Sequence, residues 1–286
     1  MKLLLSLALF LACLTCLQAQ PTHPPLDSVT LAKKKVYVSW EDALKKPDKV
    51  YRLNLSRQEL TEISPDIAKF QNLQELRCNM NQLVSLPKEI GALANLTMLD
   101  CHHNALTSLP EEVGKLVYLK YLGCSYNKLT ALPTKLGKLM ELTELYCNYN
   151  EISNLPTNIG DLTKLIRFEC YHNVLTALPA EIGKLENLNI FDFHWNYLTA
   201  LPAEIGKLKN LNTLNCSQNR LNGLPVEIAD ITNLESLNCY WNKITVVPAS
   251  FEKLKKLKLF NCNNNLLSEV EKEKIKNKLP NCKITF

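Results

Sequence analysis

A period of 23 residues runs through most of this 286-residue chain. Leucine and asparagine recur at this step nine times each, and prolines and glycines keep the same register. Length alone would suggest about two compact domains, whereas fixed self-similarity predicts a stack of repeats that each contact mainly their neighbours. The leucines are Leu73, Leu96, Leu119, Leu142, Leu165, Leu188, Leu211, Leu234 and Leu257, and the asparagines are Asn81, Asn104, Asn127, Asn150, Asn173, Asn196, Asn219, Asn242 and Asn265.

Residues 1–19 differ in kind from the repeats. Lys2 precedes an apolar stretch over residues 3–17, and small and polar residues follow, which is the layout of a secretory signal peptide cleaved after Ala19. The stretch is shorter than the ~20 residues of a membrane span. The sequence Phe-Leu-Ala-Cys ending at Cys13 also resembles the cleavage box of bacterial lipoproteins, so a lipid anchor at Cys13 is the alternative. We therefore expect an exported protein that is secreted, periplasmic or associated with the cell envelope.

The repeat unit over residues 165–187 reads LIRFECYHNVLTALPAEIGKLEN and fits the pattern L-x-x-L-x-L-x-x-N/C-x-L. The chain resembles exported bacterial leucine-rich-repeat proteins with 23-residue repeats, and its LPxEIGxLxxL half is similar to the Ras-suppressor type. This resemblance implies an α/β fold, a right-handed solenoid or horseshoe with a parallel concave sheet and short helical or 3-10 segments on the convex side. Alternation along each strand predicts that Leu165, Phe168 and Cys170 point into the core and that Arg167 and Glu169 point outward.

The two ends of the array depart from the repeat, so we divide the chain into four parts. These are a signal peptide over 1–19, a linker and N-terminal cap over 20–49, repeats over 50–267, and a C-terminal cap of helix and strand over 268–286. The capping pairs Ser39/Asp42 and Ser268/Glu271 each predict the start of a helix. Caps of this kind cover the otherwise exposed ends of an open stack.

The chain has eleven cysteines, a number that suggests disulfides in an exported protein. Eight of them occupy one column, where they replace the third leucine of the motif and so point into the core. Neighbouring strands lie ~4.8 Å apart, farther than the ~3.8 Å between Cβ atoms in a disulfide, and a line of thiols does not converge on a metal ion. We therefore predict free, buried thiols at Cys78, Cys101, Cys124, Cys147, Cys170, Cys216, Cys239 and Cys262.

Outward-facing positions near the strand ends carry many rings, including four of the five histidines and two of the three tryptophans. Interaction surfaces are enriched in Tyr and Trp, because these side chains cover apolar area and keep a polar tip. We predict a non-enzymatic module that binds a protein, in preference to a glycan, on its concave face, with Trp195 as the anchor. The predicted site residues are His103, Tyr126, Tyr146, Tyr149, Tyr171, His172, His194, Trp195, Tyr240 and Trp241.

Three other interpretations stay open at this point. The rings could pack on one another only to stiffen the stack, or the protein could be a structural or adhesive envelope protein that uses its convex face. A metal-binding or hydrolytic site could form from Glu169, His172, Asp192 and His194. Because no G-x-S-x-G, H-E-x-x-H or phosphate-binding glycine loop occurs, we expect no enzyme activity and no cofactor. The net charge of +5 is scattered, which argues against a nucleic-acid partner.

Overall fold

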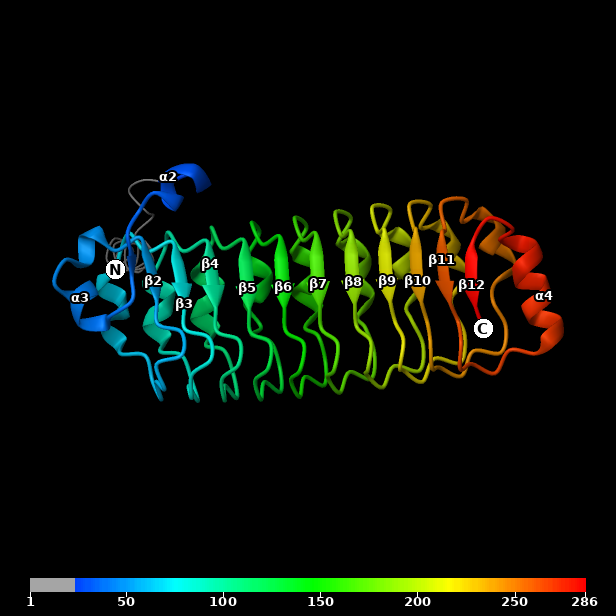
Figure 1. Cartoon of the computed structure of the whole chain (residues 1–286), viewed down its shortest axis with the longest axis horizontal. Helices are drawn as coiled ribbons and strands as arrows, with labels where there is room; N and C mark the ends of the chain where they lie inside the picture. The colour runs from blue at the N-terminus through cyan, green and yellow to red at the C-terminus, as the bar shows by residue number, and fades with distance from the viewer. Residues whose placement is uncertain (1–23) are drawn as a thin grey trace, which may run out of the picture.

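The computed structural model describes residues 24–286, so the expected signal peptide and the alternative anchor at Cys13 lie outside the described residues. Twelve strands form one sheet in chain order, and every neighbouring pair is parallel (Figure 1). Equivalent residues of successive repeats face each other, as Leu76 faces Leu99. The predicted parallel solenoid is confirmed. Among the described helices, none combines the length and the apolar character that crossing a bilayer requires.

Each repeat contributes one short strand and one 3-10 turn, except where the two ends of the array are capped by α-helices. The strands are β1 (Val36–Tyr37), β2 (Arg52–Asn54), β3 (Glu75–Arg77), β4 (Met98–Asp100), β5 (Tyr121–Gly123), β6 (Glu144–Tyr146), β7 (Arg167–Glu169), β8 (Ile190–Asp192), β9 (Thr213–Asn215), β10 (Ser236–Asn238), β11 (Leu259–Asn261) and β12 (Lys283–Thr285). The helices are α2 (Ser28–Ala32), α3 (Trp40–Leu44) and α4 (Glu269–Lys278). The 3-10 turns are η1 (Pro47–Lys49), η2 (Pro65–Lys69), η3 (Lys88–Ala92), η4 (Glu111–Lys115), η5 (Leu136–Lys138), η6 (Thr157–Asp161), η7 (Ala180–Lys184), η8 (Ala203–Lys207), η9 (Val226–Asp230) and η10 (Ala249–Lys253).

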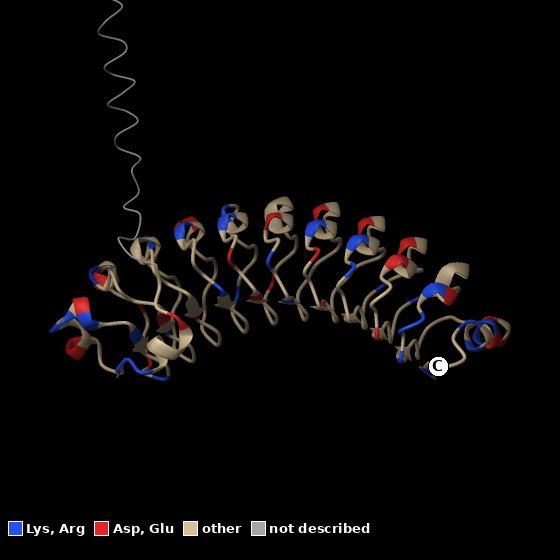
Figure 2. Ribbon diagram, turned by 90° about the horizontal axis from the view of Figure 1, so that it is seen from above, with Lys and Arg blue, Asp and Glu red and all other residues tan. Residues whose placement is uncertain are grey.

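The stack curves into an arc, with the strands along its inner side and the 3-10 turns along its outer side (Figure 2). Turns of helical backbone are bulkier than extended strands that lie ~4.8 Å apart, so packing both into one repeat bends the stack toward the strand side. Basic and acidic residues are both found along the outer turns (Figure 2). The inner side is therefore the concave face that the sequence predicted.

The core is a set of buried columns that run the length of the stack. Leu165, Phe168 and Cys170 are fully buried, which confirms their inward direction. Gly183 is required by a close approach, because a Cβ atom there would lie 2.6 Å from the backbone oxygen of Glu204 in the next repeat. The glycines that recur every 23 residues therefore set how tightly the outer turns of neighbouring repeats pack.

The asparagine column ties each repeat to the one before it. The Asn173 amide nitrogen donates to the carbonyl oxygens of Cys170 and Cys147, both at 3.0 Å, and its amide oxygen accepts from the backbone N–H of Ile152 at 2.9 Å. Asn173 is buried, so these backbone groups have no access to bulk water as a substitute partner. The asparagine column therefore has a structural role.

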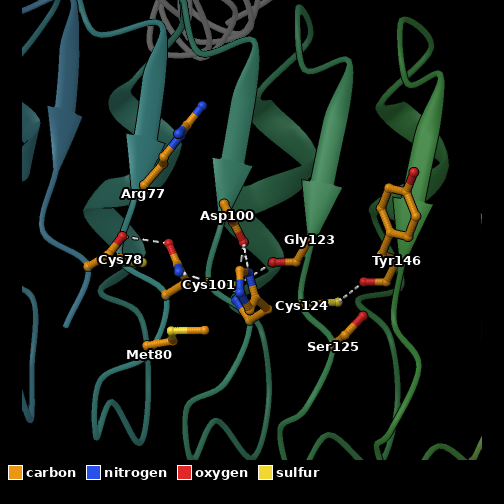
Figure 3. A network of polar contacts seen from close by, with 12 residues as sticks. Arg77, Cys78, Met80, Asp100, Cys101, Gly123, Cys124, Ser125 and Tyr146 are labelled. Carbon is orange, nitrogen blue, oxygen red and sulfur yellow. Dashed lines mark hydrogen bonds and ion pairs between the residues drawn. The ribbon is translucent and has the colours of Figure 1, made fainter. Parts of the chain in front are cut away.

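The eight cysteines of the predicted column are buried and free, as expected from their spacing. The thiols of Cys101 and Cys124 each lie 3.3 Å from a carbonyl oxygen of the next strand, those of Gly123 and Tyr146, to which they donate (Figure 3). A cysteine therefore fills this core position and also adds a weak hydrogen bond between repeats. Burial raises the pKa of the Cys78 thiol to about 12, so this thiol stays protonated and unreactive at neutral pH.

We expect iodoacetamide at pH 8 to leave the eight column cysteines of the folded protein unmodified, because the thiolate is scarce and the sulfur is inaccessible. Cys282 is half-buried and should react slowly, since burial raises its pKa to about 11. In denaturant all of these thiols should react. Peptide mapping by mass spectrometry reads the result, and rapid alkylation of the column in the folded protein would contradict it.

Both ends of the stack are closed by capped helices. The Ser39 side chain accepts from the backbone N–H of Asp42 at the start of α3, and Trp40 packs edge-on against Phe70 with ring centroids 5.4 Å apart. Ser268 caps α4 in the same way. Helix α2 was not expected from the sequence, and its first turn is held by the Asp27 side chain.

Candidate functional site

The residue before each asparagine of the repeat column, and Arg57 before Gln58 in the first repeat, adopts a left-handed backbone conformation, with φ between 51° and 59°. This conformation costs roughly 1–2 kcal/mol for residues other than glycine, asparagine and aspartate. It turns the chain sharply where each strand has ended and places the side chains in a row along one border of the concave face. We call this row the αL column; it consists of Arg57, Met80, His103, Tyr126, Tyr149, His172, Trp195, Gln218, Trp241 and Asn264.

Five consecutive members of the αL column form a continuous stack, which we call the aromatic ladder. Ring centroids are 4.0 Å apart for His103 and Tyr126, 4.2 Å for Tyr126 and Tyr149, 4.2 Å for Tyr149 and His172, and 4.9 Å for His172 and Trp195. Such pairs contribute about 0.5–1.5 kcal/mol each beyond the area that they bury. The ladder thus has a stabilising role, and its rings still present their edges and an end face to solvent.

The other predicted site residues lie beside the ladder in smaller groups. Tyr171 stacks on His194 at 4.3 Å, one column further into the concave face. Tyr240 meets Trp241 edge-on at 5.8 Å near the C-terminal end of the stack. Tyr146 lies on β6 instead, where its hydroxyl donates to the Glu144 carboxylate at 2.6 Å. Of the predicted residues, Tyr146 is therefore the one most clearly separated from the others.

Two histidines of the concave face are held by the aspartate two positions before them. His194 Nδ1 lies 2.7 Å from Asp192 Oδ1, and His102 Nδ1 makes the equivalent contact with Asp100 at the end of β4 (Figure 3). These contacts fix the orientation of both rings. Each histidine ring therefore presents a defined edge to solvent.

The residues of the suggested metal or hydrolytic site do not converge. His172 is stacked between Tyr149 and Trp195 in the αL column, whereas Asp192 is bonded to His194 and accepts from the Asn215 amide at 3.1 Å. Burial raises the pKa of Glu169 above its usual value, and Asp192 adds to this rise. Within residues 24–286, no group of three or more His, Cys, Asp or Glu side chains is arranged to hold a metal ion. This alternative has no support in the geometry.

Burial lowers the pKa of His103, and the neighbouring His102 lowers it further. The folded protein therefore favours the neutral ring, and its stability should fall as pH drops through and below the unfolded value of ~6.5. We expect the melting temperature of His103→Tyr, which keeps a ring in the ladder, to fall less than that of wild type when the pH is lowered from 7.5 to 5.5. Equal losses in the two proteins would show that His103 does not contribute, because the two chains differ at that residue alone.

Sequence reasoning missed Tyr197 and Arg220, which follow the asparagine of two successive repeats. The Arg220 guanidinium lies over the Tyr197 ring, 4.4 Å from its centroid. Both residues line a hollow of about 360 Å³ together with Trp195, Gln218 and Trp241. A ring and a guanidinium 23 positions apart are visible in the sequence, so comparing this column would have found them.

A wider hollow of about 770 Å³ lies at the opposite ends of the strands, where β6 to β10 begin. Its lining is rich in asparagine, but the architecture already uses several of these amides. Asn187, Asn210 and Asn233 each donate to a backbone carbonyl of the preceding repeat at 2.8 Å. The αL border therefore offers the more available side chains.

The repeat motif, the single parallel sheet and the asparagine column together define a leucine-rich-repeat solenoid. The family described as "Leucine-rich repeat region" matches residues 101–196, and the one described as "Leucine Rich Repeat" matches residues 233–254. A comparison with curated proteins gave no match. Domains built from leucine-rich repeats are generally modules for protein interaction, and no arrangement within residues 24–286 indicates catalysis.

Solved structures of the same fold come from bacteria and plants. A leucine-rich-repeat protein of Leptospira interrogans is 27% identical, with 88% of this chain and 100% of that chain covered and a TM-score of 0.56. InlJ of Listeria monocytogenes, whose functional domain includes a cysteine ladder, is 27% identical over 82% of this chain and 46% of that chain, with a TM-score of 0.67.

The ectodomain of the receptor kinase GASSHO1/SCHENGEN3 from Arabidopsis thaliana, in complex with CASPARIAN STRIP INTEGRITY FACTOR 2, is 31% identical with a TM-score of 0.69. The match covers 76% of this chain and 27% of that chain. This chain therefore spans about a quarter of the receptor ectodomain and less than half of the InlJ domain. The likeness to both concerns the repeat array.

Proposed function

We propose that this protein is a non-enzymatic recognition module that binds a protein ligand with the aromatic ladder and the rings beside it. The observation that carries the proposal is the exposure of large rings at positions of unfavourable backbone: Trp195 is 52% exposed and Trp241 57% exposed, both with positive φ. Stacking explains why the inner rings are kept. It does not explain two half-exposed indoles, because a solvated border would be served by polar side chains.

The chemistry of the border suits a protein more than a glycan or a nucleic acid. Tyrosine, tryptophan and histidine combine apolar faces with hydrogen-bonding tips, and tyrosine and tryptophan carry much of the binding energy in protein interfaces. The receptor ectodomain to which this chain is similar was solved in complex with CASPARIAN STRIP INTEGRITY FACTOR 2, which supports a recognition role for this solenoid. The ligand and the face that it contacts are our proposal for this chain.

We also propose that the protein works outside the cytoplasm, on the sequence of residues 1–19 alone. Mass spectrometry of the mature N-terminus tests this: a start at Gln20 supports free secretion, and a diacylated Cys13 supports a lipid anchor. An intact Met1 would contradict export.

The experiment that tests recognition is affinity capture from cell-envelope extract and from neighbouring cells. Wild type is compared with the double variant Trp195→Ala, Trp241→Ala and with a convex-face control, Glu181→Ala, Lys184→Ala. Proteins captured by wild type and by the control but lost in the tryptophan variant support the proposal. Capture that survives in the tryptophan variant and disappears in the control would favour the structural or adhesive alternative on the convex face.

A further inference from the structure

The row of rings is interrupted at a single repeat near its C-terminal end. Trp195 ends the aromatic ladder, Gln218 follows in the next repeat, and Trp241 carries the next ring of the αL column. These three residues have φ of 53°, 52° and 52°, so their side chains leave equivalent backbone positions. Two tryptophans therefore flank one position at which the ring is missing.

The gap has the width of one further ring. Two repeat steps of ~4.8 Å place equivalent side chains about 10 Å apart. A ring between two others needs a contact distance of ~3.5 Å on each side, about 7 Å in total. The hollow of about 360 Å³ lies at this gap, with Gln218 and the Arg220–Tyr197 pair also in its lining. We call it the tryptophan slot, defined by Trp195, Tyr197, Gln218, Arg220 and Trp241.

One side of the tryptophan slot is positively charged. Its lining includes the Arg220 guanidinium and no carboxylate. Lys243 follows Arg220 in the same column of the next repeat, and both side chains are exposed. A guest that presented a negative charge beside its ring would therefore be favoured.

Resting on the proposed function, we propose that the tryptophan slot receives one aromatic side chain of the protein ligand, which is flanked by acidic residues. The guest ring lies between Trp195 and Trp241 and completes the row of rings, while its acidic neighbours face Arg220 and Lys243. The half-buried Gln218 amide supplies a hydrogen-bonding partner for the polar tip of an indole or a phenol. The pocket thus selects both a ring and a charge.

A substitution of one slot residue can fill the tryptophan slot with a side chain of the protein itself. Gln218→Trp places a ring at a backbone position that already carries tryptophan in the repeats on either side. The substitution should continue the stack and leave the melting temperature equal or higher. It therefore separates loss of the slot from loss of folding.

The test uses the side-chain indole N–H signals of the mature full chain in ¹⁵N–¹H NMR, with the unlabelled peptide acetyl-Glu-Trp-Glu-amide as probe. Trp195 and Trp241 report on the slot, and Trp40, which packs on Phe70 in the N-terminal cap, is an internal control. We expect the peptide to shift the two slot signals and to leave the Trp40 signal in place. Acetyl-Lys-Trp-Lys-amide and acetyl-Glu-Leu-Glu-amide should each bind more weakly.

In Gln218→Trp the affinity for acetyl-Glu-Trp-Glu-amide should fall by about tenfold or more, because the space between the two indoles is occupied. Unchanged affinity in this variant, or slot signals that do not respond to the peptide, would overturn the proposal. Slot signals that respond to an N-acetylglucosamine tetramer and not to the peptide would also overturn it, in favour of a sugar guest.

These results are distinguishable from a failure of the proposed function. If partner capture depends on Trp195 and Trp241 but the peptide does not bind, the slot assignment is wrong and concave recognition stands. If the peptide binds in the slot but capture is the same in wild type and in the double tryptophan variant, the slot stands and the proposed function is wrong.

Discussion

Replacing Asn173 with alanine should lower the free energy of unfolding by about 2–4 kcal/mol, the largest stability loss that we expect from a single polar side chain. The carbonyls of Cys147 and Cys170 each keep a second amide donor, Asn150 and Asn196 respectively. The backbone N–H of Ile152 has no such reserve, because its partner is the Asn173 amide oxygen. A buried donor is left unpaired, and a small cavity adds to the cost.

Urea denaturation followed by circular dichroism measures this loss. The control is Asn265→Ala near the C-terminal end, where the equivalent asparagine is only half-buried and water can replace its bonds. We expect the control to lose about 1 kcal/mol or less. Equal losses at Asn173 and Asn265 would mean that burial does not decide the strength of the asparagine column.

Replacing Trp195 with alanine should weaken binding of the captured protein ligand by about 30-fold or more, since a central aromatic anchor in an interface commonly contributes at least ~2 kcal/mol. Trp195 is the end of the ladder and one wall of the tryptophan slot, so its removal exposes His172 and opens the slot together. Isothermal titration calorimetry gives the affinity directly.

Met140→Ala is the matched control for this measurement. Met140 is 61% exposed, comparable to Trp195, but it lies after η5, away from the ladder. Its removal should change affinity by less than about twofold. If Met140 matters and Trp195 does not, the binding face lies away from the aromatic ladder.

Most of the fold could be predicted because its determinants are local and repeated. The leucine and cysteine columns specify which side chains point inward, and the asparagine column specifies how successive turns are joined, so a single unit such as residues 165–187 contains the rules for the whole array. The inward direction of Phe168 and Cys170 and the free thiols follow from strand alternation and strand spacing alone.

The candidate site could be predicted only in part, since its geometry depends on backbone conformation that the residue types disguise. Tyrosine and tryptophan rarely adopt positive φ, so nothing about Tyr149 or Trp195 indicated a left-handed turn. That turn is what brings the rings into register. The role of Gln218 was equally hidden, because a glutamine among rings gains meaning only when its neighbours are known to stack.

The periodic sheet has a consequence for how such a protein could change. A solenoid of this kind gains or loses length in whole repeats of 23 residues. The distance between equivalent residues along its border therefore changes by whole repeat steps. Deleting the one unit that carries Gln218 would bring Trp195 and Trp241 into direct contact, and duplicating it would separate them by a further step. Selection for a different ligand would therefore change the spacing of these border residues by whole repeats and not by small increments.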